Sequence, residues 1–181
     1  MAAITSAEIV WRYSVTTGTA GNTVAGTAAG SLGKYISTTA WAGGAANDLF
    51  DDISGSENAA STVDYRGIFV YNSNGFNAYQ NPTAYISAEV AGGASIAIGA
   101  DTTATSALGS ATAQALTIAT ETTAPVGVTF SSPTTAATGV ALSSIPSGNV
   151  KGLWVRRTAA NTAAINADGV TLATSGDTAA A

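Results

Sequence analysis

The chain contains neither cysteine nor histidine among its 181 residues. The absence of cysteine excludes disulfides, thiolate ligands and cysteine nucleophiles. The absence of histidine removes the commonest general base and the commonest zinc ligand. We therefore expect no catalytic triad, no transition-metal site and no cofactor. Only carboxylates, lysines, tyrosines and hydroxyls remain for chemistry, and the sequence predicts a protein that is not an enzyme.

Charge is also scarce, since charged residues make up 9% of the chain and the formal net charge is -5. Six basic residues supply too little positive charge for the phosphate contacts on which nucleic-acid binding depends. No apolar run approaches the length of a membrane-spanning helix, and the N-terminus lacks the basic and apolar regions of a signal peptide. We therefore expect neither a nucleic-acid partner nor insertion into a membrane.

Threonine, alanine, glycine and serine dominate the sequence. Threonine is β-branched and suits a pleated surface, whereas Gly, Thr and Ser interrupt the alanine-rich stretches and weaken helices there. Short apolar runs separated by turn residues predict an all-β fold, an antiparallel β-sandwich of jelly-roll or immunoglobulin-like type. The predicted strands span residues 7–16, 34–38, 65–72, 78–90, 94–100, 113–120, 126–130, 139–142, 150–157 and 170–174.

The predicted strands are concentrated in the later part of the chain. Residues 17–33 are a loop of small residues with little to bury. A helical turn is predicted at residues 47–53, with Asn47 as its N-cap. We therefore predict an extended N-terminal arm and irregular region in residues 1–62, and a β-sandwich in residues 63–178.

Two distant segments share the order basic, Gly, aliphatic, aromatic, Val: "RGIFV" at residues 66–70 and "KGLWV" at residues 151–155. Alternation along such strands places bulky apolar side chains on both faces. These strands are either covered on both sides, or their aromatic face meets a neighbouring subunit. Each segment is followed by a dipeptide typical of a type I′ hairpin turn, Asn-Gly at 74–75 and Asp-Gly at 168–169.

The run "LFDDISGSENAASTVDYRGIFVYN" and the later segment "IPSGNVKGLWVRRT" together resemble a group of small structural proteins of tailed bacteriophages. In that group, an LF-D segment ending in (S/T)-G-x-E leads into a YR-x-(I/L)-(F/Y)-V strand, and an I-P-x-G turn leads into a W-(V/I)-R-R strand. The resemblance covers about residues 47–178. The commoner family pattern has cysteine where Gly67 stands, which argues against a covalent role at that position.

The resemblance implies a non-enzymatic structural protein located in the virion. We expect a capsid decoration protein, a homo-oligomer that binds the major capsid protein or other virion proteins and stabilises the outer shell. The alternative is a tail or head-fibre module that contacts host surface carbohydrate. The predicted binding element is residues 1–46, and the predicted partner-contact residues are Trp11, Tyr13, Phe69, Trp154 and Arg156.

Five of the eleven acidic residues lie between residues 47 and 72, namely Asp48, Asp51, Asp52, Glu57 and Asp64. They could gather around Ca²⁺, or two of them could flank a glycosidic bond. Their spacing does not follow an EF-hand loop, and aromatic residues, at 7%, are few for a sugar cleft. We favour a structural interpretation, in which these carboxylates solvate a loop, support a helix N-terminus or pair with Arg66, Arg156 and Arg157, and no metal is bound.

Overall fold

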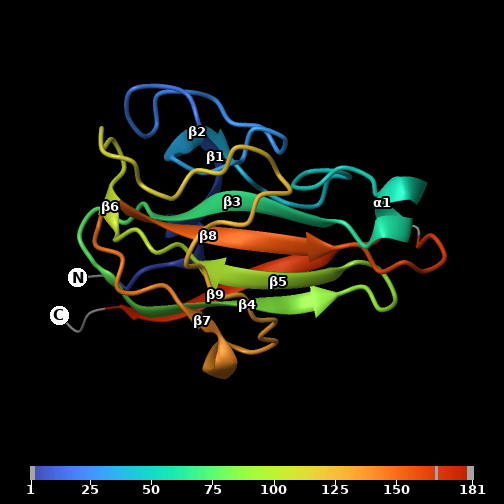
Figure 1. Ribbon diagram of the computed structural model, residues 1–181. Coiled ribbons are helices and arrows are strands. Elements are labelled where there is room, and N and C mark those ends of the chain that lie inside the picture. The colour runs from blue at the N-terminus through green and yellow to red at the C-terminus, as the bar shows by residue number, and fades with distance from the viewer. Residues whose placement is uncertain (1–2, 166, 179–181) are drawn as a thin grey trace.

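The computed structural model describes residues 3–165 and 167–178. Two antiparallel sheets pack against each other, which confirms the predicted all-β sandwich. Helix α1 (Gly55–Ala60) lies at one end, and the first and last described residues lie at the other (Figure 1). The strands are β1 (Ile9–Val15), β2 (Tyr35–Ala40), β3 (Val63–Asn72), β4 (Tyr79–Glu89), β5 (Ser95–Ala100), β6 (Ser106–Ala107), β7 (Val140–Ala141), β8 (Asn149–Thr158) and β9 (Val170–Thr178), and η1 (Ser6–Glu8) and η2 (Ala136–Thr138) are short 3₁₀ helices.

The large sheet has the strand order β2-β1-β3-β8-β5, with β6 also paired to β8, and the small sheet has the order β7-β4-β9. Figure 1 shows β3, β8 and β5 side by side. Strand β1 is antiparallel to β3, from Ile9 opposite Asn72 to Tyr13 opposite Ile68, and it pairs with β2 on its other side. The strand predicted at residues 7–16 is therefore present, as β1, but it is an internal strand of the sandwich, where the sequence predicted an extended arm.

The main core lies between the two sheets. Ile68 of β3 and Leu153 of β8 are almost completely buried there and pack in one cluster with Ile86 of β4. Full burial of such a side chain stabilises the fold by about 1.5–3 kcal/mol. The centre of the large sheet is therefore fixed by apolar contacts to the small sheet.

The opposite face of β3 and β8 is buried as well. Phe69 and Trp154 point to this outer face and are 0% exposed. Phe69 packs in a second cluster with Ile36 of β2 and Ala115 of the loop between β6 and β7. Of the two alternatives drawn from the alternation pattern, cover on both sides is the one observed.

The cover of the outer face consists of loops, where the sequence predicted two strands. Residues 113–120 contain one isolated bridge, between Thr117 and Gly33. Residues 126–130 contain no strand, and the neighbouring Ser131 bridges Ile98 of β5. These segments have strand-like composition, but the backbone groups in and next to them bond to other loops and to a sheet edge. Neither forms a ladder.

The two similar segments found in the sequence pair with each other at the centre of the large sheet. Ile68 lies opposite Leu153, so Gly67 faces Trp154 and Gly152 faces Phe69. A Cβ at Gly67 would lie 3.2 Å from the backbone nitrogen of Gly33, and one at Gly152 would lie 2.9 Å from Asp101 Cβ, so other parts of the chain fill the space that each glycine leaves. The shared sequence order therefore gives a local two-fold arrangement in which both strands are approached closely by the segments that cover them.

Helix α1 begins later than the helical turn predicted at residues 47–53. Ser54 is its N-cap, with its hydroxyl accepting from the N–H of Glu57 at 3.3 Å, while the Glu57 carboxylate accepts from the N–H of Ser54 at 2.7 Å. This is the S-x-x-E capping box. The predicted cap, Asn47, instead has a left-handed φ of 58°. The capping box was the signal in the sequence that would have located the helix.

The two predicted hairpins are also absent. Strands β3 and β4 belong to different sheets, as do β8 and β9, so each dipeptide lies in a crossover between sheets. Neither Gly75 nor Gly169 has the positive φ of a type I′ turn. None of the helices in the described part of the chain has the length and apolar character needed to cross a membrane.

The loops that cover the outer face of β3 and β8 form what we call the loop layer, and Gly33 shows how closely this layer is packed. Its φ is +94°, and a Cβ at this position would lie 1.9 Å from the carbonyl oxygen of Leu116. Gly44 has a similar φ of +86° but nothing within 4 Å. We expect Gly44→Ala to lower the free energy of unfolding by about 1 kcal/mol, from the left-handed backbone alone, and Gly33→Ala to lower it by about 3 kcal/mol or more. Urea denaturation measures both, and equal losses would contradict the close contact between Gly33 and Leu116.

Candidate functional site

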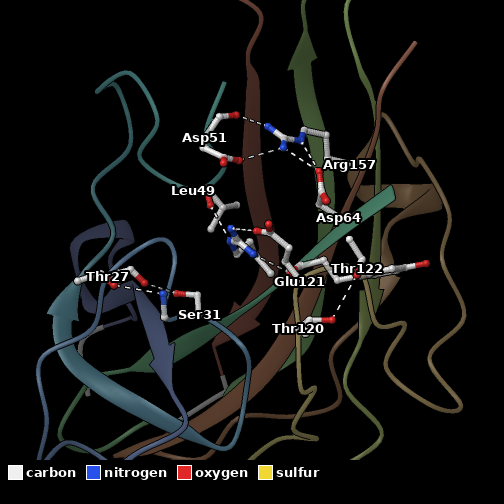
Figure 2. Close-up of polar contacts among 12 residues, drawn as sticks. Thr27, Ser31, Leu49, Asp51, Asp64, Thr120, Glu121, Thr122 and Arg157 are labelled. Atoms are coloured by element: carbon white, nitrogen blue, oxygen red, sulfur yellow. Dashed lines mark hydrogen bonds and ion pairs between the residues drawn. The ribbon is translucent and has the colours of Figure 1, made fainter. Parts of the chain in front are cut away.

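The acidic segment, residues 48–64, meets the large sheet at Arg157, near the end of β8 (Figure 2). Its Nη2 lies 2.7 Å from Asp64 Oδ2 and 3.1 Å from Asp51 Oδ1. Asp64 stands directly opposite Arg157 on β3, and its side chain is 4% exposed, whereas that of Asp51 is 63% exposed. The buried Arg157–Asp64 pair is therefore the stronger electrostatic contact, and the exposed Asp51 is a second, weaker partner of the guanidinium.

A second arginine holds the same segment from β3. Arg66 Nε donates to the carbonyl of Leu49 at 3.2 Å, and its Nη2 pairs with Glu121 of the loop layer (Figure 2 shows Leu49 and Glu121). The ring of Phe50 lies 5.6 Å from Arg66 Cζ and 4.8 Å from Arg157 Cζ. Contact with an aromatic ring is favourable for both cations. Residues 49–51 are therefore fixed by two arginines.

The other acidic residues of the segment have separate places. The carboxylate of Glu57 caps α1, and its hydrogen bonds from Ser54 lower the pKa of Glu57. Asp52 is exposed, and Asp48 accepts a 2.5 Å hydrogen bond from the Tyr13 hydroxyl through its backbone carbonyl. Across residues 3–165 and 167–178, no group of three or more His, Cys, Asp or Glu side chains could hold a metal ion. The predicted pairing with arginine is confirmed for Asp51 and Asp64.

Asp101 was not singled out in the sequence, yet it joins the loop layer to the sheet. It is 2% exposed, and its Oδ2 accepts from Trp154 Nε1 at 2.6 Å and from the N–H of Leu116 at 2.9 Å. Lys151 Nζ donates to the Asp101 backbone carbonyl at 2.7 Å. Burial lowers the pKa of Lys151, and the nearby charge of Asp101 partly offsets that effect. Through these hydrogen bonds the cluster holds the loops in place against β8.

Two of the predicted partner-contact residues are part of the core. Phe69 and Trp154 are completely buried, and their side chains therefore present no surface to a partner. The prediction failed for these two because the loops that cover them lie far away in the sequence.

The other three predicted contact residues are partly buried and also bind within the chain. Trp11 and Tyr13 lie on the inner face of β1 and pack against the main core. The Trp11 ring meets Trp41 edge-on, with centroids 6.1 Å apart. Arg156 lies on the outer face of β8, with Cζ 5.3 Å from the centre of the Phe130 ring. The five predicted contact residues therefore do not form one surface.

A different aromatic residue, Phe76, is the prominent exposed one, with 83% of its surface accessible. It lies in the β3–β4 loop, where Asn74 Oδ1 accepts from the N–H of Phe76 at 2.9 Å and of Asn77 at 2.7 Å. The Asn74 side chain also donates to Glu8 at 2.7 Å. The backbone of the loop is thus held in place while the ring projects into solvent. Asn-Gly-Phe is an Asx-turn sequence that could have indicated this arrangement.

Among the described residues, the most exposed large apolar side chains are Val126, at 85%, and Phe76, at 83%. Comparison with known protein families, curated proteins and solved structures gives no match for this chain. Function must therefore be inferred from the exposed surface and from the sequence resemblance.

The two aspartates bound by Arg157 allow a matched test of buried charge. Asp64→Asn leaves Arg157 buried with only a solvent-exposed carboxylate, and we expect it to lower the free energy of unfolding by about 3 kcal/mol. Asp51→Asn makes the same chemical change at an exposed position and should cost less than about 1 kcal/mol. Chemical denaturation of both variants measures the difference. Similar losses would show that Asp64 is not the main partner of Arg157.

The arrangement of the carboxylates also predicts the effect of removing metal. Because arginines and a helix cap engage the acidic segment, EDTA should leave the melting temperature unchanged. A calcium ion held at a hundred times its Kd would instead stabilise the protein by about 2.7 kcal/mol. Thermal unfolding with and without EDTA decides between the two, and a large decrease would place a metal ion in the segment.

Proposed function

We propose that the protein is a non-enzymatic structural protein of a tailed-phage virion, specifically a capsid decoration protein bound to the outer shell. The observation that carries the binding role is Phe76, an aromatic side chain that is 83% exposed on a loop fixed by Asn74. Exposed aromatic residues held in one conformation are typical anchors of protein interfaces, because little ordering entropy is lost when they bind.

The residues that carry the resemblance to phage structural proteins support the virion assignment. They lie where the fold depends on them: Arg66 and Val155 face each other across the central strand pair, and Arg157 holds the acidic segment. A chain that shares these segments would need the same central strand pair, which favours a common sandwich.

Decoration would act by mass action. A protein that binds only the assembled shell lowers the free energy of that state and so stabilises it. The segment predicted to bind, residues 1–46, contains β1 and β2 of the large sheet and is not a free arm. The proposed contact is therefore the rigid β3–β4 loop, and binding needs no strand to leave the sandwich.

The proposal predicts that Phe76 contributes to particle binding and not to folding. Phe76→Ser should leave the melting temperature unchanged, because the ring packs against little of its own chain. It should weaken binding to purified tailed-phage particles by about tenfold or more, as expected for an interface anchor. Val126→Ser, which removes a similarly exposed apolar side chain from another loop, is the matched control.

Co-sedimentation with particles from the cells that produce the protein measures binding, and cryo-EM of those particles locates it. Density on the shell at capsid symmetry would support decoration. Density on the tail or on a head fibre would favour the alternative module. A protein absent from purified particles, or Phe76→Ser particles with full occupancy, would overturn the proposed contact.

A further inference from the structure

The outer edges of the two sheets differ in how far other parts of the chain cover them. An edge strand exposes unpaired N–H and C=O groups, and proteins usually cover, shorten or charge such edges. In this sandwich the edges lie at β2 and β5 of the large sheet and at β7 and β9 of the small sheet. The hydrogen bonds along each edge show which of them remain open to another strand.

Both edges of the large sheet are closed by other parts of the chain. At β2, the carbonyl of Ile36 accepts from the N–H of Asn22 at 2.7 Å, and the N–H of Ile36 donates to the Gln114 side chain at 3.0 Å. At β5, Ile98 exchanges two backbone hydrogen bonds with Ser131, at 2.8 and 3.0 Å. The N–H and C=O groups of these edges therefore already have partners.

The β7 side of the small sheet is blocked as well. Strand β7 contains two residues, Val140–Ala141, and the adjoining N–H of Ile86 in β4 donates to the carbonyl of Pro133 at 2.8 Å. The segment leading to η2 therefore covers the part of β4 that β7 does not reach.

Strand β9 is the exception. Within residues 3–165 and 167–178, its backbone is bonded only toward β4, through the strand ladder and the hydroxyls of Thr83 and Ser87. The strand is nine residues long, contains no proline or lysine, and carries a single charge, on Asp177. It lacks the features that normally prevent strand addition.

We propose that β9 pairs antiparallel with β9 of a second copy of this chain, which joins the two small sheets into one continuous sheet. A two-fold axis perpendicular to the sheet keeps the inner face of each strand on the inner side. Pairing centred on Thr174 places Asp177 opposite Thr171 of the second copy. The two aspartates are then not opposed, so no like charges face each other across the pair.

The same register fits the space beside β9. A cavity of about 370 Å³ lies between residues 4–6, β1 and the end of β9, with both apolar and hydroxyl side chains in its walls, among them Trp11 and Thr174. Leu172 is on the inner face of β9, where it packs against the main core. Pairing centred on Thr174 brings Leu172 of the second copy opposite Gly176, next to this cavity. The incoming strand would therefore lie along the open side of this cavity.

The size of the contact sets the expected affinity. Nine residues at about 3.3 Å each give a strand pair roughly 30 Å long. We expect a contact made by one strand from each copy to bury an area at the low end of the range for specific interfaces. We therefore expect a reversible dimer whose population rises with protein concentration. This association concerns the isolated protein and does not depend on capsid binding.

The test exploits the charge facing Asp177. Thr171→Lys would place opposite charges across both symmetric pairs and tighten the dimer, whereas Thr171→Asp would oppose like charges and weaken it. Two exposed cross-strand pairs should change the dissociation constant by about 2- to 30-fold in each direction. Thr134→Lys and Thr134→Asp, at an exposed position near the other edge of the small sheet, are the controls and should have no effect.

Sedimentation equilibrium from about 1 µM to 1 mM protein measures the dissociation constant, and the melting temperature confirms that each variant is folded. Concentration-dependent dimers with opposite responses to Thr171→Lys and Thr171→Asp would support pairing through β9. A monomer over the whole range would overturn the proposal. A dimer that responds in the same way at positions 171 and 134 would place the contact elsewhere.

Discussion

The burial of the β3–β8 strand pair on both faces is the constraint on which the rest of the structure depends. One face meets a regular sheet, but the other is covered by loops whose backbone groups are not paired in a strand ladder. Because buried N–H and C=O groups must be paired, these loops need specific hydrogen bonds. Asp101 and Gln114 provide such bonds, since Asp101 accepts from the N–H of Leu116 and Gln114 donates to the carbonyl of Leu108.

The same constraint explains the roles of the few charged residues in this chain. Asp64 and Arg157 face each other on the central pair, and Arg66 reaches from β3 to the loop layer and the acidic segment. A buried ion pair contributes little net stability, but loss of one partner is costly. Charge therefore fixes the position of irregular segments against the sheet, while apolar burial supplies the stability.

This organisation limits where a partner can bind. The large aromatic side chains of β3 and β8 are enclosed, and β1 lies between two other strands. Among the features left at the surface of the described residues are the Phe76 ring on its fixed loop and the unpaired edge of β9. The Phe76 ring suits a pocket on another protein, whereas the β9 edge suits an extended strand. The two features therefore suit different kinds of partner surface and would act independently.

Local sequence pattern determined the all-β class and the central strands, because alternation is a property of neighbouring residues. It offered pairing with arginine as one of three roles for the acidic residues, and the contacts of Arg157 with Asp51 and Asp64 were decided by the tertiary structure. The place of β1, the cover over Phe69 and Trp154, and the role of Asp101 were decided by contacts between residues far apart in the chain. Periodicity records only that both faces of a strand are apolar. Whether a loop of the same chain or a second protein covers the aromatic face depends on the path of the loops, and only the tertiary structure determines that path.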